Sequence, residues 1–306
     1  MRNDPGKKAA YGMIKYGFAG ETRAVEHLHH GYMRAEVAAP AHAHSCKNGK
    51  VTGELYAKEP QPGNTVALTI DLDLQKTAED SLAATIQSMT KSDGVARGGA
   101  AAVVGVGTGE VLALASYPTY DLSQWDEMYD TWNKDTVGRP MFNRATDGTY
   151  APGSTFKLCS AVAALESGIV TPSTTIVDRG IYTYYTFPQP KCWIYNSYGG
   201  THGAVNVSQA ITVSCNYFFY EVGRLMGIKT LDSYATQFGL GQHTGIEIGD
   251  SAGVLASPEY AEKIGETWTD GQTITAAIGQ SYNLFTPLQL ANYVATLVSG
   301  GDHYEA

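Results

Sequence analysis

Apolar residues recur along the chain in two spacings that predict different elements. Residues 100–106 and 111–116 are almost continuously apolar and flank the turn Gly-Thr-Gly-Glu at 107–110, which predicts an antiparallel hairpin. Because both faces of both strands are apolar, we expect this hairpin in the middle of a covered sheet. A shorter β-type run at residues 65–70 predicts one further strand.

Helical spacing appears in four other segments. Asp71 is a predicted N-cap, and the helix after it would carry on one face Leu74, Ala78, Leu82, Ile86 and Met89. Residues 154–166 predict a second helix that ends at Gly168, and residues 207–222 and 286–297 predict two more. The stretch 176–198 is rich in Tyr, Pro and Thr, so we expect it to be extended and loop-like.

The first 60 residues differ from the rest in composition. They contain five of the eight histidines and show little strand pattern, and the turn residues at 60–64 mark a plausible domain boundary. The histidine cluster could be a metal site, but no acidic or cysteine partner stands at ligand spacing, so a solvated surface is the preferred interpretation. The five histidines are His27, His29, His30, His42 and His44.

Composition excludes several classes of protein. With 43% hydrophobic and 17% charged residues, the chain is neither a disordered acidic tail, a coiled coil nor a collagen-like protein. The net charge of −9 would repel phosphate backbones, so we do not expect nucleic acid as a partner. Four cysteines match neither a zinc signature nor a redox pair, which leaves free thiols or one bridge open. They are Cys46, Cys159, Cys192 and Cys215.

The sharpest local feature is the stretch 150–157, Tyr-Ala-Pro-Gly-Ser-Thr-Phe-Lys. Its Pro-Gly pair predicts a turn followed at once by a helix, so Ser154 would lie at a helix N-terminus that favours developing negative charge. Lys157 follows one turn later on an apolar helix, where burial would favour loss of its proton. A neutral amine beside a serine can act as a general base toward a nucleophile. Ser-x-x-Lys alone is frequent, and more often marks a helix cap beside a surface lysine.

A second motif is Ser214-Cys215-Asn216, which stands between two apolar runs. A hydroxyl and a carboxamide at this spacing can relay a proton and hold a substrate amide. Ordinary hydrogen bonding within a helical turn is the simpler interpretation of this motif by itself. Cys159 and Cys215 lie near the two motifs, but no histidine is placed to activate either, so both are interpreted as small packing residues.

Taken together, these motifs and six further segments occur in the order of a known family. The segments are 68–75, 99–116, 143–145, 150–157, 244–247, 277–280 and 286–289. Ser-x-x-Lys and Ser-x-Asn, with Lys-Thr-Gly, form the signature shared by penicillin-binding proteins and class A β-lactamases. Over about residues 60–300 the chain resembles class B penicillin-binding proteins.

This resemblance implies a fold and an activity. The fold would be α/β of the α+β type, like penicillin-binding proteins and β-lactamases, with an antiparallel central sheet covered by helices. The activity would be that of a peptidoglycan D,D-transpeptidase, which cross-links stem peptides through a serine acyl-enzyme. Ser154 would attack the penultimate D-Ala carbonyl and Lys157 would take its proton. Ser214 would pass that proton to the leaving amine, and Asn216 would hold the substrate backbone.

Partners and location also follow from the resemblance alone. The implied ligands are stem peptides ending in D-Ala-D-Ala and β-lactam antibiotics, and no cofactor or metal is implied. A membrane glycosyltransferase would be the protein partner, in cell division or in cell shape. The implied location is the extracytoplasmic face of a bacterial plasma membrane, although no anchor segment is recognisable in this sequence.

One departure from the family concerns its third motif. No Lys-Thr-Gly or Lys-Ser-Gly occurs in this sequence, and His243-Thr244-Gly245 is rejected as a substitute because it falls in an earlier element of the family. We therefore expect a chain truncated at both ends, with the last strands of its sheet missing. Residues 1–60 would be a remnant of the non-catalytic pedestal domain, and residues 61–306 an incomplete transpeptidase domain. We also expect slow acylation, or none, by a fluorescent penicillin.

Two other interpretations stay open from the residues. A serine β-lactamase or a β-lactam sensor would share Ser-x-x-Lys, but a lactamase needs a carboxylate or a carboxylated lysine for deacylation, and no such motif is recognisable. The sensors and class D enzymes usually carry Val or Ile where Asn216 stands. The remaining interpretation is an inactive fragment or a binding module without the Lys-Thr-Gly strand.

Overall fold

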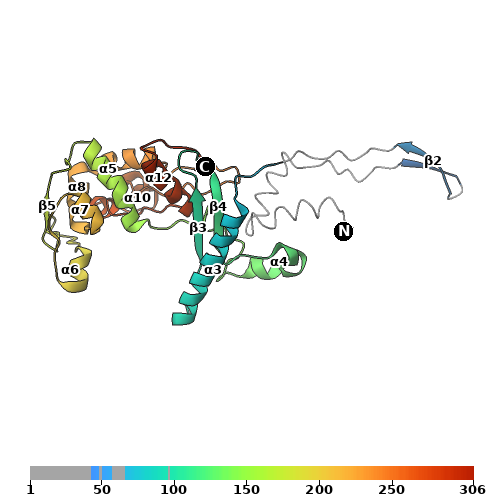
Figure 1. Cartoon of the computed structure of the whole chain (residues 1–306), viewed down its shortest axis with the longest axis horizontal. Helices are drawn as coiled ribbons and strands as arrows, with labels where there is room; N and C mark the ends of the chain where they lie inside the picture. Colours follow the sequence, from blue (N-terminus) through green and yellow to red (C-terminus); the bar gives the residue numbers. More distant parts are fainter. Residues whose placement is uncertain (1–42, 48–49, 57–65, 96) are drawn as a thin grey trace.

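The computed structural model describes residues 43–47, 50–56, 66–95 and 97–306 (Figure 1). Within these residues, no helix combines the length and the apolar character needed to span a membrane. The strands are β1 (Ala43–Lys47), β2 (Lys50–Tyr56), β3 (Gly99–Val104), β4 (Val111–Tyr117), β5 (Ile176–Asp178) and β6 (Gly203–Val205). The helices are α3 (Leu72–Asp93), η2 (Leu122–Gln124), α4 (Trp125–Lys134), η3 (Gly153–Phe156), α5 (Lys157–Glu166), α6 (Trp193–Tyr198), α7 (Val207–Thr212), α8 (Asn216–Met226), α9 (Ile228–Gln237), α10 (Pro258–Lys263), α11 (Asp270–Ala276) and α12 (Pro287–Val298).

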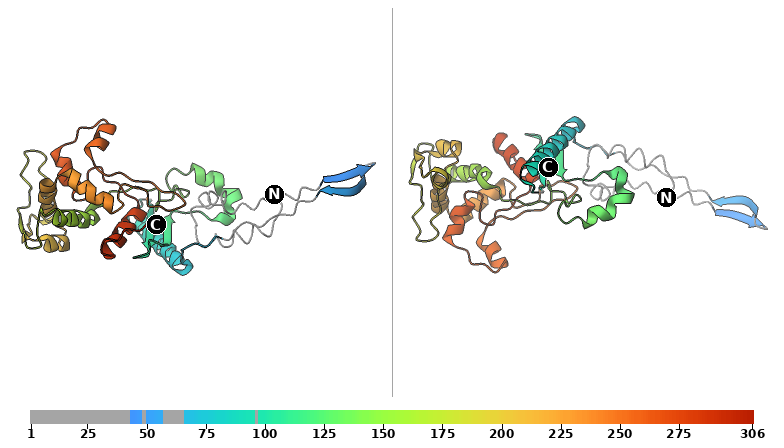
Figure 2. Two further views of the ribbon diagram at one scale, coloured as in Figure 1. Left: turned by 90° about the horizontal axis from the view of Figure 1, so that it is seen from above. Right: turned by 90° about the horizontal axis from the view of Figure 1, so that it is seen from below.

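The predicted hairpin is confirmed as the antiparallel pair β3 and β4, which is covered by α3 and α12 (Figures 1 and 2). Asp71 caps α3 as predicted, because its side chain accepts from the N–H of Leu74. Gln75, on the next turn of α3, is buried. Its side-chain amide pairs with the backbone of β4 as a neighbouring strand would. Its Nε2 donates to the carbonyl of Leu114 at 2.9 Å, and its Oε1 accepts from the Leu114 N–H at 2.6 Å. This pair of bonds fixes α3 along β4.

The larger core lies among the helices on one side of the hairpin, with α4 on the other side (Figure 2). Helix α5 runs through this region and contacts α7, α8 and α9, while α11 packs on α8. The small residues of α5 are buried and its Leu158, Val162 and Leu165 are partly buried against the core, as its apolar pattern predicts. The largest buried apolar side chains of this core include Phe156, Phe218, Phe219, Leu231, Leu240 and Ile274. The helix that carries the Ser-x-x-Lys motif is therefore held from several sides.

Two predictions fail near the hairpin and at the chain start. Residues 66–70 form no strand, because they meet β4 only through isolated bonds. The hydroxyl of Thr69 donates to the carbonyl of Val111 at 2.7 Å, and the N–H of Asp71 to that of Leu112 at 2.9 Å. Residues 1–60 were expected to hold little strand, yet β1 and β2 pair in antiparallel fashion within them. The histidine cluster lies outside the described side chains.

Two helix predictions also need correction. The helix predicted over 207–222 is two helices, α7 and α8, because residues 213–215 leave the helical path. Asn206 begins α7 with a capping box, and Cys215 caps α8. The stretch 176–198 is largely extended, but it ends in the short helix α6, whose N-cap is Cys192.

Candidate active site

Ser154 lies in a tight turn at the start of the central helix. The turn η3 has 3-10 geometry, so the helix predicted over 154–166 is confirmed with a tightened first turn. The N–H of Gly153 donates to the carbonyl of Gly279 at 2.9 Å, and Gly279 has a φ of 73°. A Cβ on Gly279 would collide with the backbone of Gly153. A glycine in the motif at 277–280 thus permits the close approach that holds the serine turn.

Lys157 points from the buried face of α5 into a group of oxygen atoms. Only 2% of the residue is exposed. Its Nζ donates to the carbonyl and to the Oγ of Ser214, both at 2.9 Å, and to Oδ1 of Asn216 at 2.5 Å. Burial lowers the pKa of Lys157 to about 8. The lysine is therefore partly neutral near neutral pH, as its position on an apolar helix predicts.

Ser214 completes the link between the lysine and the serine. Its Oγ lies 3.1 Å from the Oγ of Ser154, with Ser214 as donor. Ser214 has a φ of 51°, a left-handed conformation that is unusual for a residue other than glycine. This backbone turn both ends α7 and aims the Ser214 carbonyl and hydroxyl at Lys157. The strained conformation is compensated by the three hydrogen bonds that the segment makes with the amine.

The four predicted catalytic residues therefore meet in one hydrogen-bonded cluster. The hydroxyl of Ser154 is exposed, whereas the amine that would activate it is buried. The hydrogen bonds that connect them run through the hydroxyl of Ser214. Hydroxyl groups can both donate and accept, so this path can carry a proton from Ser154 to a neutral Lys157 and back again.

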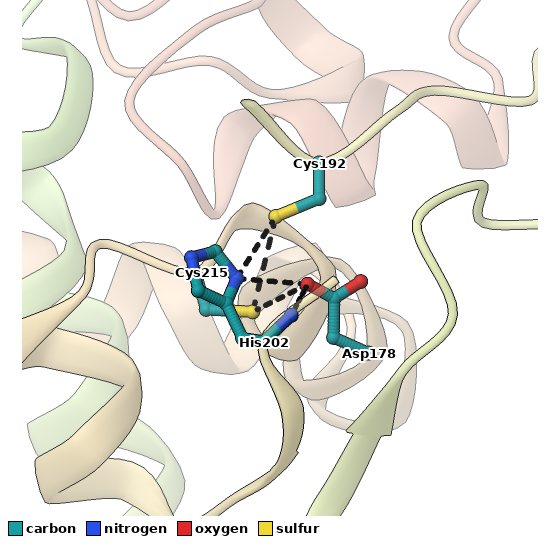
Figure 3. A group of neighbouring side chains, drawn as sticks. All are labelled: Asp178, Cys192, His202 and Cys215. Atoms are coloured by element: carbon teal, nitrogen blue, oxygen red, sulfur yellow. Dashed lines mark hydrogen bonds and ion pairs between the residues drawn. The ribbon is translucent and has the colours of Figure 1, made fainter. Parts of the chain in front are cut away.

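A second polar cluster lies behind the Ser214–Asn216 segment and was not predicted (Figure 3). Cys215 points away from Lys157, and its Sγ lies 3.9 Å from the Sγ of Cys192 and 3.6 Å from Oδ2 of Asp178. His202 places Nδ1 2.8 Å from the same Oδ2 and 3.5 Å from the Sγ of Cys192. The residues stand 14, 10 and 13 positions apart, from the numbers 178, 192, 202 and 215, so no short ligand motif announces them.

The donor set of this cluster fits a zinc ion. One ligand atom from each residue lies within 4.8 Å of the others, and Asp178 is only 2% exposed. Bonds of 2.0–2.3 Å to a tetrahedral zinc would separate ligand atoms by about 3.3–3.8 Å. Three of the six separations, 3.5, 3.6 and 3.9 Å, are near that range, whereas Nδ1 of His202 and Oδ2 of Asp178 are 2.8 Å apart and would have to separate. The Nε2 atom of His202 is buried without a hydrogen-bond partner, so burial of this ring carries an uncompensated free-energy cost.

The protonation of the thiols also suits a metal. A hydrogen bond from Cys215 lowers the pKa of Cys192 to about 6, and the same bond raises the pKa of Cys215. One thiolate is therefore available near neutral pH, and thiolates are the form that binds zinc. Cys159, Cys192 and Cys215 are all free, as one of the two sequence interpretations expects. Cys159 and Cys215 are both fully buried in the larger core, as predicted, and Cys215 also belongs to this polar cluster.

The other motifs support the site without contributing to its chemistry. His243 is exposed and pairs with Asp250 at 2.9 Å. Thr286 and Gln289 form a capping box at the start of α12, and Nε2 of Gln289 also donates to the carbonyl of Ala252 at 2.9 Å. The carbonyl of Ala145 accepts from the first turn of α12. These segments of the family pattern connect the hairpin to the helical part of the structure.

Residues 99–305 match the family described as penicillin binding protein transpeptidase domain. The chain belongs to this family. The match includes all four predicted catalytic residues and the four residues of the thiol cluster. The helix and sheet composition described above agrees with it, so the expected fold class is confirmed by the relatives that follow.

Curated proteins named peptidoglycan D,D-transpeptidase are similar to this chain over most of its length. The peptidoglycan D,D-transpeptidase MrdA of Acinetobacter baumannii is 33% identical over 294 residues, which cover 94% of this chain and 41% of the relative. The Escherichia coli protein of the same name is 32% identical over 311 residues, covering 98% and 45%. The chain thus spans less than half the length of these curated relatives.

Solved structures of penicillin-binding proteins share the fold. Pseudomonas aeruginosa PBP2, in complex with WCK 5153, is 33% identical with a TM-score of 0.69, over 79% of this chain and 53% of that one. Helicobacter pylori PBP2, in a complex with MreC, is 25% identical with a TM-score of 0.70, over 85% and 47%. Both likenesses place this chain among penicillin-binding transpeptidases.

Proposed function

We propose that this chain carries the catalytic serine, base and relay of a peptidoglycan D,D-transpeptidase. The observation that carries the proposal is the hydrogen-bonded cluster of Ser154, Ser214, Lys157 and Asn216 inside the family match. Relatives that cover 94% and 98% of the chain are named for this activity. The substrate would be a stem peptide that ends in D-Ala-D-Ala.

The geometry supports a two-step acyl transfer. A neutral Lys157 draws the Ser154 proton through the Ser214 hydroxyl, and the Ser154 oxygen attacks the carbonyl of the penultimate D-Ala. The backbone N–H of Ser154 lies at the start of the helix and would donate to the developing oxyanion. The proton then returns along the same path to the leaving D-Ala amine. An amine of a second stem peptide resolves the acyl-enzyme and forms the cross-link.

A β-lactam tests this assignment because it would acylate the same serine. The chain is incubated for hours with excess benzylpenicillin, since slow reaction is expected without Lys-Thr-Gly, and its intact mass and peptides are measured. We expect one adduct on Ser154, and none in Ser154→Ala. Ser173→Ala is the matched control, because Ser173 is exposed and lies outside the turn that holds Ser154, so the adduct should be retained. An adduct on another residue, or one that persists in Ser154→Ala, would contradict the proposal.

The β-lactamase alternative is separated by turnover of nitrocefin. A transpeptidase should give at most one slow burst per protein, because its acyl-enzyme awaits an amine rather than water. Sustained hydrolysis that is lost in Ser154→Ala would favour a lactamase instead. The presence of Asn216 in the position that contacts Lys157 argues against a class D enzyme or a sensor, which usually carry Val or Ile there.

We further propose the domain limits, partners and location given by the family. Residues 1–60 would belong to a pedestal domain and residues 61–306 to the transpeptidase domain, and the second range contains the family match at residues 99–305. Helicobacter pylori PBP2 is described in complex with MreC, and another similar chain in a peptidoglycan synthase complex. A comparable scaffold protein and a membrane glycosyltransferase are the proposed partners, at the extracytoplasmic face of the plasma membrane.

The thiol cluster favours a second role for this chain, the binding of a metal ion. We infer that Asp178, Cys192, His202 and Cys215 hold one zinc ion, which would fix the segment that presents Ser214 and Asn216 to Lys157. The near-tetrahedral spacing of four ligand atoms supports this. Zinc bound to the purified protein, measured by elemental mass spectrometry, should approach one per chain. Zinc below a tenth per chain after dialysis against zinc and removal of the excess would contradict the inference.

A further inference from the structure

Tyr293, on the middle of α12, reaches into the first turn of the catalytic helix. The residue is fully buried, and its ring packs edge-on against Phe238 with centroids 5.3 Å apart. Its hydroxyl accepts from the N–H of Cys159 at 2.8 Å and donates to the carbonyl of Thr155 at 3.2 Å. Burial raises the pKa of Tyr293, so the phenol stays protonated and can keep donating.

These two partners are the ones that an α-helix would join to each other. In an uninterrupted α-helix the N–H of each residue pairs with the carbonyl four positions earlier, which for Cys159 is Thr155. The Tyr293 hydroxyl binds both groups at this point. A side chain that inserts into the ladder in this way distorts the helix locally.

The backbone before this point has the tighter geometry that such an insertion favours. Residues 153–156 form the 3-10 turn η3, and the N–H of Lys157 donates to the carbonyl of Ser154, three positions earlier. The ψ angles of Pro152, Phe156 and Lys157 are −23°, −18° and −25°, close to the 3-10 values.

This tight turn has a direct effect on the catalytic pair. Three residues advance by about 300° in an α-helix but by about 360° in a 3-10 helix, so residues three apart eclipse only in the latter. Ser154 and Lys157 are three apart, and both must meet the hydroxyl of Ser214. A relaxed α-helical turn would rotate them apart by about 60°.

We propose that Tyr293 is a positioning residue that holds the Ser154–Lys157 turn in the 3-10 form and thereby aligns both side chains on Ser214. It touches no substrate and acts through the backbone of Thr155 and Cys159. The proposal rests on the proposed transpeptidase function only for its effect on rate. Its structural part concerns the turn alone and holds for any reaction at Ser154.

The test compares Tyr293→Phe with Tyr282→Phe, which also loses one tyrosine hydroxyl bond, from Nε2 of Gln272 at 2.7 Å. Acylation by benzylpenicillin is followed by intact mass between pH 6 and pH 10. We expect Tyr293→Phe to slow acylation by about 10²-fold, because misplacement of reacting groups by about 1 Å has effects of that size. Its pH midpoint should also shift, since Lys157 leaves its present partners. Tyr282→Phe should stay within about threefold, with the midpoint unchanged.

Crystal structures of both variants decide the structural part even if no protein is acylated. In Tyr293→Phe we expect the N–H of Cys159 to bond to the carbonyl of Thr155, and Ser154 to lose its contact with Ser214. A 3-10 turn that persists in Tyr293→Phe would overturn the proposal. If Tyr293→Phe loses folding stability but keeps the pH midpoint of acylation, the proposal is also overturned. That combination is expected of a tyrosine with a purely structural role. An adduct on the parent chain at a residue other than Ser154 would instead contradict the transpeptidase function.

Discussion

Two polar clusters share the segment Ser214–Asn216 and face opposite ways from it. Ser214 and Asn216 turn toward Lys157, while Cys215 between them turns toward Asp178, Cys192 and His202. The first cluster opens to solvent at Ser154. The second is closed, since three of its members are at most 2% exposed. The first cluster is the proposed path for a proton, and the second is the proposed zinc site that would hold the segment in place.

The contrast shows how a catalytic lysine can be buried without an acidic partner. The amine of Lys157 is surrounded by a carbonyl, a hydroxyl and a carboxamide oxygen, which solvate either protonation state. A carboxylate at this place would raise the pKa of the lysine and remove the base. The carboxylate of the region, Asp178, is instead behind the segment with the thiols. Separation of the two clusters therefore preserves the function of each.

The largest effect should come from Lys157→Met, which removes the base and leaves the second cluster intact. General-base catalysis contributes about 10²–10⁴-fold, so acylation of Ser154 should fall by that factor. The rate is measured by intact mass with benzylpenicillin, and zinc content is measured on the same sample. Zinc should be unchanged. A parallel loss of zinc would show that the two clusters are not separable.

The converse variant is Cys192→Ser, which removes one thiol from the second cluster without touching the Ser-x-Asn motif. Zinc affinity, measured by competition with a chromophoric chelator, should fall by at least about tenfold, because hydroxyls are poor zinc ligands beside thiolates. Cys159→Ser is the matched control, since Cys159 is equally buried but lies outside the cluster. Equal zinc affinity in the two serine variants would argue against the metal site.

The pH dependence of acylation should follow Lys157 alone. Its pKa is lowered by burial to about 8, so the neutral fraction rises from about one in eleven at pH 7 to about ten in eleven at pH 9. Acylation should therefore increase about tenfold between these pH values, with a midpoint near 8. Rates corrected for β-lactam hydrolysis provide the measurement. A profile that is flat, or that falls with pH, would exclude a neutral lysine base.

The smallest effect is expected from Asn206→Ala, at the N-cap of the helix that leads into the shared segment. Loss of its capping box should lower the free energy of unfolding by about 0.5–2 kcal/mol. Urea unfolding followed by circular dichroism measures the change. Acylation and zinc content of the folded protein should both remain at the parent level. A selective loss of either would mean that α7 positions one cluster more than the other.

Local patterns were sufficient to predict much of the fold and of the first cluster. The hairpin, the cap at Asp71 and the helix after Ser154 depend on neighbours in sequence, and all three are confirmed. Ser154 and Lys157 are three residues apart, so their turn could be inferred from spacing. The resemblance to the family, based on the order of its segments, predicted that Ser154 and Lys157 share one site with Ser214 and Asn216.

The errors arise where distant contacts override local preference. Nothing in the sequence at 207–222 interrupts helical spacing, and the break at Ser214 is compensated by bonds from Lys157, 57 residues earlier. The thiol cluster draws on β5, the N-caps of α6 and α8, and the residue before β6, so it could not be found from spacing. Tyr293 likewise shows no signal, because a buried tyrosine on an apolar helix face is typical of packing. Only the position of its hydroxyl distinguishes it.

The exposure of Ser154 above a buried Lys157 has a consequence for the size of molecule that can react. A deep cavity admits only what can diffuse into it, and a strand of cell-wall polymer is far too large to do so. A nucleophile at the surface can instead meet a peptide that is still attached to such a strand. In the proposed reaction, the exposed Ser154 would meet the polymer at the surface, while its proposed proton acceptor, Lys157, stays buried.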